Sequence, residues 1–220
     1  DESEEAAEKT NNFRDDFEAD TLNIKFQTLR GPLKEDAMSL SERPNHLRLK
    51  GQESITSRFY QSLIATRQKD FNYQVTTSVD FEPEIFQQMA GLVCYYNTNN
   101  FYYLRISYSE KLGKNLGIIT CNKGKLKEPL ENNISLQPEE KYHLRVKVEK
   151  EKLQFYYSKD EDNWNSIGPV LDAGKLSDEY VKGWGFTGTF VGLCCQDLTG
   201  AQQPADFDYF EYIEDNKLKD

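Results

Sequence analysis

The sequence predicts an all-β protein built as an antiparallel sandwich, and three observations support this class. Apolar and polar residues alternate with a period of two in many short stretches, of which residues 47–50 and 71–76 are clear examples. Polar turns separate these stretches at short intervals. No segment of three helical turns shows the period of 3.6 typical of an amphipathic helix. Many strands without alternating helices favour a sandwich or jelly roll over a parallel α/β sheet.

The expected strands follow one another along most of the chain, and the joins between them indicate antiparallel pairing. The polar turn at residues 97–100 lies between two aromatic strands, and the charged turn at residues 149–152 lies between two more, so we expect a hairpin at each. Residues 171–180 are compatible with one short helix. Alternation predicts further strands at residues 87–96, 101–108, 116–121, 142–148, 153–158, 184–195 and 206–213.

Length and composition indicate one domain with two polar ends. The chain has 220 residues, a common length for a single all-β domain with one core. Residues 1–12 are acidic and contain no large apolar side chain, so we expect a linker or lead-in there. The sandwich domain is therefore expected over residues 13–214, followed by a polar tail at residues 215–220.

The charge and the cysteine content argue against several classes of partner. A formal net charge of -10 repels phosphate backbones and anionic membrane surfaces, so we expect no nucleic acid and no membrane as partner. No apolar run approaches the length that spans a bilayer, and the acidic start of the chain does not resemble a secretory leader. The four cysteines form no CxxC pair and are expected to be buried free thiols. These features favour a reducing compartment and a cytoplasmic protein.

Residues suited to nucleophilic or cofactor chemistry do not occur in the contexts that such chemistry needs. Both histidines, His46 and His143, open alternating strands and are followed by Leu and Arg, which is typical of a structural histidine at a strand end. No nucleophile elbow, phosphate-binding loop or dinucleotide fingerprint occurs. The sequence therefore indicates no required cofactor.

Acidic residues in strand-like context raise the question of glycoside hydrolysis, which needs two carboxylates at a defined separation. In the last predicted strand, alternation places Asp206 and Asp208 on one face and Phe207, Tyr209 and Glu211 on the other. Because acidic residues are usually solvated, a polar outer face is the simpler interpretation. We assign no catalytic residue.

Residues 182–190 form the most unusual stretch, in which three glycines are interleaved with three aromatic residues. Glycine lets the backbone bend or approach a ligand closely, and Trp184 and Phe186 offer flat faces on which a sugar ring can stack. A bulged strand whose aromatic residues complete the core would give the same pattern. Chemistry alone leaves both interpretations open.

Several segments together resemble one family. These are residues 13–17 (FRDDF), 28–33 (TLRGPL), 86–92 (FQQMAGL) with 95–97 (YYN), and 185–188 (GFTG). They are similar to the C-terminal concanavalin A-like domain of glycoside hydrolase family 43 β-xylosidases, over nearly the whole chain from about residue 13 to about residue 212. The resemblance implies a concanavalin A-like, laminin-G-like sandwich. It also implies an accessory role, in which a separate five-bladed propeller carries the catalytic acid and base and the sandwich packs against it.

The resemblance also implies which residues form the site. Sandwiches of this family send a phenylalanine towards the active site of the propeller, where it closes the pocket for a short xylo-oligosaccharide. Matched motif to motif, Phe186 is the candidate for that residue, with Trp184 and Thr187 as further substrate-binding residues in the same stretch. Concanavalin A-like sandwiches often hold a structural calcium ion between the first and last strands, where Asp16 (or its neighbour Asp15) and Asp208 are candidate ligands.

Two other functions remain open from the sequence. The chain could be a free-standing carbohydrate-binding module, with Trp184, Phe186 or a tyrosine cluster as the stacking surface; the cluster comprises Tyr95, Tyr96, Tyr102 and Tyr103. It could also be a structural sandwich that forms a homo-oligomer through an exposed aromatic face.

Overall fold

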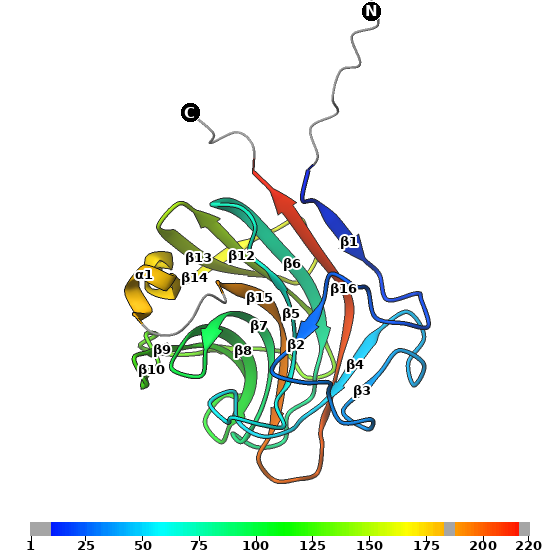
Figure 1. Cartoon of the computed structure of the whole chain (residues 1–220). Coiled ribbons are helices and arrows are strands. Elements are labelled where there is room, and N and C mark those ends of the chain that lie inside the picture. The colour runs from blue at the N-terminus through cyan, green and yellow to red at the C-terminus, as the bar shows by residue number, and fades with distance from the viewer. Residues whose placement is uncertain (1–9, 183–187, 216–220) are drawn as a thin grey trace, which may run out of the picture.

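The structure, a computed structural model, describes residues 10–182 and 188–215. Within these residues, two antiparallel eight-stranded sheets lie face to face, and the helical content is limited to two short turns (Figure 1). The predicted all-β sandwich is therefore confirmed. In the described part of the chain, no helix is long and apolar enough to cross a bilayer.

The first sheet contains both ends of the described chain. Its strands run in the order β14, β13, β12, β6, β16, β4 and β3, and β1 pairs with β16 (Figure 1). The long strand β16 thus receives β4 along its first half and β1 along its second half. The strands of this sheet are β1 (Phe13–Asp15), β3 (Met38–Ser39), β4 (Leu47–Lys50), β6 (Asn72–Asp80), β12 (Tyr142–Glu149), β13 (Lys152–Ser158), β14 (Asn165–Asp172) and β16 (Pro204–Glu214).

The second sheet is built around consecutive hairpins. Its strands run in the order β10, β9, β8, β7, β15, β5 and β2, and β11 pairs with β9. The predicted hairpin at residues 97–100 is confirmed here, and the one at residues 149–152 is confirmed in the first sheet between β12 and β13. The strands of the second sheet are β2 (Gln27–Thr28), β5 (Ser62–Arg67), β7 (Gln88–Asn97), β8 (Asn100–Ser109), β9 (Gly113–Asn122), β10 (Lys125–Lys127), β11 (Ile134–Ser135) and β15 (Phe190–Asp197).

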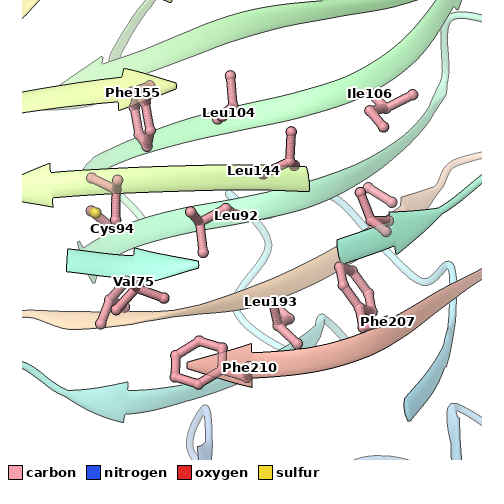
Figure 2. Packing of buried hydrophobic residues seen from close by; sticks show 14 of the residues in the cluster. Val75, Leu92, Cys94, Leu104, Ile106, Leu144, Phe155, Leu193, Phe207 and Phe210 are labelled. Atoms are coloured by element: carbon pink, nitrogen blue, oxygen red, sulfur yellow. The ribbon is translucent and has the colours of Figure 1, made fainter. Parts of the chain in front are cut away.

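The main core fills the space between the sheets, because alternate residues of each strand point inward. In β4, for example, Leu47 and Leu49 are fully buried while Arg48 and Lys50 are half-buried. Figure 2 shows side chains from both sheets meeting in this layer. Burial of one such side chain stabilises the fold by about 1.5–3 kcal/mol. The labelled members are Val75, Leu92, Cys94, Leu104, Ile106, Leu144, Phe155, Leu193, Phe207 and Phe210.

A second apolar cluster covers the outer face of the second sheet. Its residues alternate with those of the main core along each strand, so Val93 belongs to this cluster while Leu92 belongs to the core. Large aromatic members are buried here as well, among them Tyr95, Phe101 and Tyr103. The second sheet is therefore apolar on both faces over part of its area.

All four cysteines lie in the second sheet as buried free thiols, as predicted. Burial raises the pKa of Cys94 and of Cys194 to about 12, because a thiolate would lose its hydration there. Neither thiol is ionised at neutral pH, so both side chains act as small apolar groups.

The last strand differs from the prediction because it contains a β-bulge. The pairing of β16 with β6 slips between Phe207 and Tyr209, so Asp208 occupies an extra position. Phe207 and Phe210 both point into the core, whereas the Tyr209 hydroxyl lies 3.4 Å from Nδ1 of His143 on the outer face. The predicted regular alternation of residues 206–211 is wrong, because one extra residue exchanges the two faces of a strand.

Other elements also differ from the prediction. In place of one helix at residues 171–180, the structure has the end of β14, a 3₁₀ turn (Ala173–Leu176) and the single-turn helix α1 (Asp178–Val181). Among the described residues, β15 begins at Phe190 rather than near residue 184. Strands β5 and β14 were not predicted, since β5 is buried on both faces and β14 is an irregular edge strand.

Candidate functional site

The three predicted substrate-binding residues Trp184, Phe186 and Thr187 lie outside the described residues. The structure describes the chain on either side of them. Before the segment, Lys182 ends α1 in a left-handed conformation with φ of 45°. After the segment, Gly188 has φ of 68°, and a Cβ atom there would lie 3.1 Å from Nη1 of Arg67. The segment is therefore attached at one rim of the second sheet, between α1 and β15.

Hydrogen bonds hold α1 and the preceding turn against the second sheet. The Tyr96 hydroxyl donates to Oδ1 of Asp178 over 2.6 Å, and the Tyr102 hydroxyl donates to the carbonyl of Asp172 over 2.8 Å. On the other side of the segment, the Thr189 hydroxyl donates to the carbonyl of Leu176 over 2.6 Å. These contacts connect both attachment points of residues 183–187 to the same corner of the fold.

A hollow of about 400 Å³ opens on the outer face of the second sheet beside this corner. Its lining residues belong to or adjoin the strands β2, β5, β15 and β7, which are neighbours in the second sheet. Polar and aromatic side chains share its lining, which includes Thr28, Arg30, Arg67, Tyr95, Asn97 and Phe190.

The charge of the hollow favours an anionic occupant. Arg30 and Arg67 bring two positive charges, and no described acidic side chain lines the hollow. Tyr95 borders the hollow but is 1% exposed, and its hydroxyl is closed off from the surface and has no hydrogen-bond partner among the described residues. Burial raises the pKa of Tyr95, so this hydroxyl stays protonated.

The predicted tyrosine stacking surface is wrong. The backbone of the second sheet separates its four members: Tyr95 and Tyr103 belong to the outer cluster, whereas Tyr96 and Tyr102 belong to the core. All four are buried, and each is at most 6% exposed. Their ring faces are therefore not available together to a sugar.

The acidic residues considered for catalysis are held in ion pairs. Asp206 is 7% exposed at its side chain and accepts from Nε of Arg48 over 2.7 Å and from Nη1 of Arg43 over 2.8 Å. Burial favours a raised pKa, but the hydrogen bonds and charges of the two arginines outweigh it and lower the pKa of Asp206. A general acid in glycoside hydrolysis needs a raised pKa instead. Asp80 bonds to the same Arg43, so this cluster stabilises the fold.

The histidines also have structural surroundings, as expected. His143 is 4% exposed, and its Nδ1 lies 3.2 Å from Oε1 of Glu161. Burial is the main cause that lowers the pKa of His143. His46 Nδ1 lies 2.8 Å from the carbonyl of Pro44. Both side chains belong to the outer face of the first sheet, away from the hollow.

The candidate calcium ligands Asp16 and Asp208 are each occupied by a basic side chain. Asp16 accepts from Nε of Arg14 over 2.8 Å, and Asp208 accepts from Nζ of Lys141 over 2.9 Å. In residues 10–182 and 188–215, no group of three or more His, Cys, Asp or Glu side chains could hold a metal ion. Calcium takes about six to eight oxygen ligands, backbone carbonyls and water among them, so calcium binding at Asp16 and Asp208 stays a prediction.

This hollow was not predicted from the sequence. Arg30 and Arg67 are far apart along the chain and come together because β2 pairs with β5, with Gln27 opposite Ala65. No local sequence pattern predicts this contact. The segment 28–33, which contains Arg30, contributed to the family resemblance, but no role for this arginine followed from the sequence.

The described residues thus form a two-sheet antiparallel sandwich in which Asp206, an acid considered for catalysis, is held in ion pairs. Comparison with known proteins makes the assignment specific. The family model described as the β-xylosidase C-terminal concanavalin A-like domain matches residues 14–213. The chain belongs to this family.

Individual relatives agree with the family assignment. The chain is 48% identical over 202 residues to a β-xylosidase of Bacillus subtilis, covering 91% of the chain and 38% of the relative. It is 38% identical over 198 residues to xylosidase/arabinosidase 43B of Humicola insolens, covering 87% of the chain and 37% of the relative. The crystal structure of a xylan β-1,4-xylosidase from Bacillus halodurans superposes with a TM-score of 0.89 at 44% identity, covering 91% of the chain and 39% of that structure. The chain thus spans about two fifths of the length of these relatives.

Proposed function

We propose that this domain is the accessory sandwich of a β-xylosidase or arabinosidase and packs on a catalytic domain in the remainder of a longer polypeptide. The observation that carries the proposal is the family match to residues 14–213 together with the length of the relatives, of which the chain covers 38% and 37%. The catalytic domain would be a five-bladed propeller that supplies both carboxylates. The substrate class is a short xylo-oligosaccharide.

The attachment points of residues 183–187 support a direct role at the substrate pocket. Gly188 and Lys182 are fixed to one corner of the sandwich, so a partner seated at that corner lies within reach of Phe186 and Trp184. A phenyl ring placed against the pocket of the catalytic domain would exclude water and limit the length of the substrate. This contribution requires no proton transfer by the sandwich.

The proposal is tested with a chimera that carries this chain in place of the matching domain of the Bacillus subtilis β-xylosidase. We expect turnover of an aryl xyloside by the chimera and none by the 220-residue chain alone. Phe186→Ala in the chimera should lower kcat/KM by about tenfold through loss of substrate positioning. Phe86→Ala, which removes an exposed ring elsewhere (67% exposed), serves as the matched control and should leave kcat/KM unchanged.

Two results would contradict the proposal. An inactive but folded chimera would argue against an accessory role. Turnover by the isolated chain that one carboxylate substitution abolishes would show that the sandwich has a catalytic site of its own. Binding of xylo-oligosaccharides by the isolated chain, measured by calorimetry, would favour the alternative of a free-standing carbohydrate-binding module.

A further inference from the structure

The two arginines beside the hollow differ from most other arginines of the domain. Like Arg58 and Arg145, neither Arg30 nor Arg67 forms an ion pair with a described acidic residue, and no described acid lines the hollow that Arg30 and Arg67 border. Arg30 Nη1 donates to the carbonyl of Arg58, and the Arg67 guanidinium lies 5.2 Å from the centre of the Phe190 ring. Ion pairs do form around four other arginines, namely Arg14, Arg43, Arg48 and Arg105.

Exposed aromatic side chains extend the hollow onto the neighbouring surface. Phe59 and Tyr60 follow Arg58 directly and are 63% and 58% exposed. Tyr60 lines a second, smaller hollow, and Leu29 belongs to the lining of both hollows. We call Arg30, Phe59, Tyr60, Arg67 and Phe190 the arginine–aromatic surface.

The chemistry of this surface is that of a protein interface. Arginine and aromatic residues are enriched at the centre of interfaces, where they supply most of the binding free energy. No described acid lines either hollow, although the whole chain carries a formal net charge of -10. A neutral sugar has no charge to match two guanidinium groups that lack an acidic partner among the described residues, and a second copy of this acidic chain would be repelled overall. An acidic protein surface matches both the charge and the aromatic area.

The position of the surface indicates which protein that is. Gly188, which immediately follows the segment carrying Phe186, lies against Arg67. We propose that the arginine–aromatic surface is the face on which the catalytic domain of the same polypeptide sits, with acidic side chains of that domain pairing with Arg30 and Arg67. This inference rests on the proposed function, and it adds the contact face and the charge of the partner.

The test uses the chimera described above with the double substitution Arg30→Glu and Arg67→Glu. The matched control is Lys125→Glu with Lys127→Glu on the exposed edge strand β10, which changes the net charge by the same amount. We expect the double arginine variant to lower kcat/KM by about tenfold or more, since close interfacial charge pairs are coupled at least that strongly. X-ray scattering should show a larger radius of gyration as the domains separate. The control should match the unsubstituted chimera in both measurements.

The outcomes separate the inference from the proposed function. An active, compact chimera whose properties are the same with the arginine and the lysine substitutions overturns the inference and leaves the proposed function intact. An inactive unsubstituted chimera overturns the proposed function and the inference with it. Two other results for the double arginine variant overturn the inference alone. If the variant loses xylo-oligosaccharide binding while its radius of gyration stays the same, the surface binds a sugar. If sedimentation shows that the variant has half the mass of the unsubstituted chimera, the surface binds a second copy of the chain.

Discussion

Two pairs of arginines in this domain have different surroundings. In the first sheet and its adjoining loop, Arg43 and Arg48 both bond to Asp206, which is nearly buried. Beside the second sheet, Arg30 and Arg67 border a hollow without a described acid. The first arrangement is complete within the domain and serves its stability. The second is incomplete, and we interpret it as half of an interface. The comparison shows that charges without a described partner single out one surface of the domain, which is the surface we propose as the contact face.

The largest effect is expected from breaking the complete arrangement. Asp206→Ala leaves Arg43 and Arg48 without their shared carboxylate and should lower the free energy of unfolding by about 3 kcal/mol, measured by urea denaturation. Asp208→Ala is the control, because this carboxylate pairs with Lys141, which is 51% exposed at its side chain. Such an exposed pair contributes about 1 kcal/mol or less. Equal losses in the two variants would contradict the distinction.

A smaller difference is expected between two tyrosines of the second sheet. The Tyr103 hydroxyl donates to the carbonyl of Cys194 over 3.0 Å, whereas the Tyr95 hydroxyl has no described partner. Tyr103→Phe should therefore cost about 1 kcal/mol in the isolated domain, and Tyr95→Phe should cost nothing or stabilise slightly. Urea denaturation measures both. If Tyr95→Phe costs as much as Tyr103→Phe, the Tyr95 hydroxyl has a partner inside the domain.

The acid arm of the stability curve should also reflect the complete arrangement. The pKa of Asp206 is lowered in the folded protein because the bonds from Arg48 and Arg43 outweigh the opposing effect of burial. A group with a lowered folded pKa stabilises the fold above its unfolded pKa, so its contribution is lost as the pH falls below about 4. Asp206→Asn should make the unfolding free energy less dependent on pH in that range. Identical dependence in both proteins would contradict the assignment.

The smallest effect is expected from the incomplete arrangement. Arg67→Ala in the isolated domain removes no described ion pair and should change the free energy of unfolding by no more than about 0.5 kcal/mol. The same substitution should weaken the assembled chimera. A loss above about 1 kcal/mol in the isolated domain would mean that Arg67 already has a partner within it.

The sequence predicted strands well where one face is buried and the other is solvated. β4 and β12 show regular alternation, with Leu144 and Val146 in the core and Arg145 between them on the outer face. β5 was missed because Ile64 lies in the core while Leu63 and Ala65 lie in the outer cluster, so polar residues do not mark one face. The bulge at Asp208 was invisible, because nothing in the local pattern distinguishes an extra residue from a regular one.

The candidate site was less accessible to sequence reasoning than the fold. Phe186, Trp184 and Thr187 were selected through family resemblance, and the structure describes the chain only on either side of them. Arg30 and Arg67 form one surface through the pairing of β2 with β5, which is a long-range contact without a local signature. Charge counts over the chain also hide the surface, because its positive side chains are outnumbered elsewhere.

The buried cysteines provide a direct view of the sheet that carries the proposed interface. Cys94 lies in β7, Cys121 in β9, and Cys194 and Cys195 in β15, so all four report on the second sheet. An alkylating reagent reaches such thiols only when the surrounding strands open. The alkylation rate of these thiols therefore reports how often this sheet opens. A catalytic domain bound to the arginine–aromatic surface should lower the alkylation rate, so the association of the two domains can be measured without any substitution.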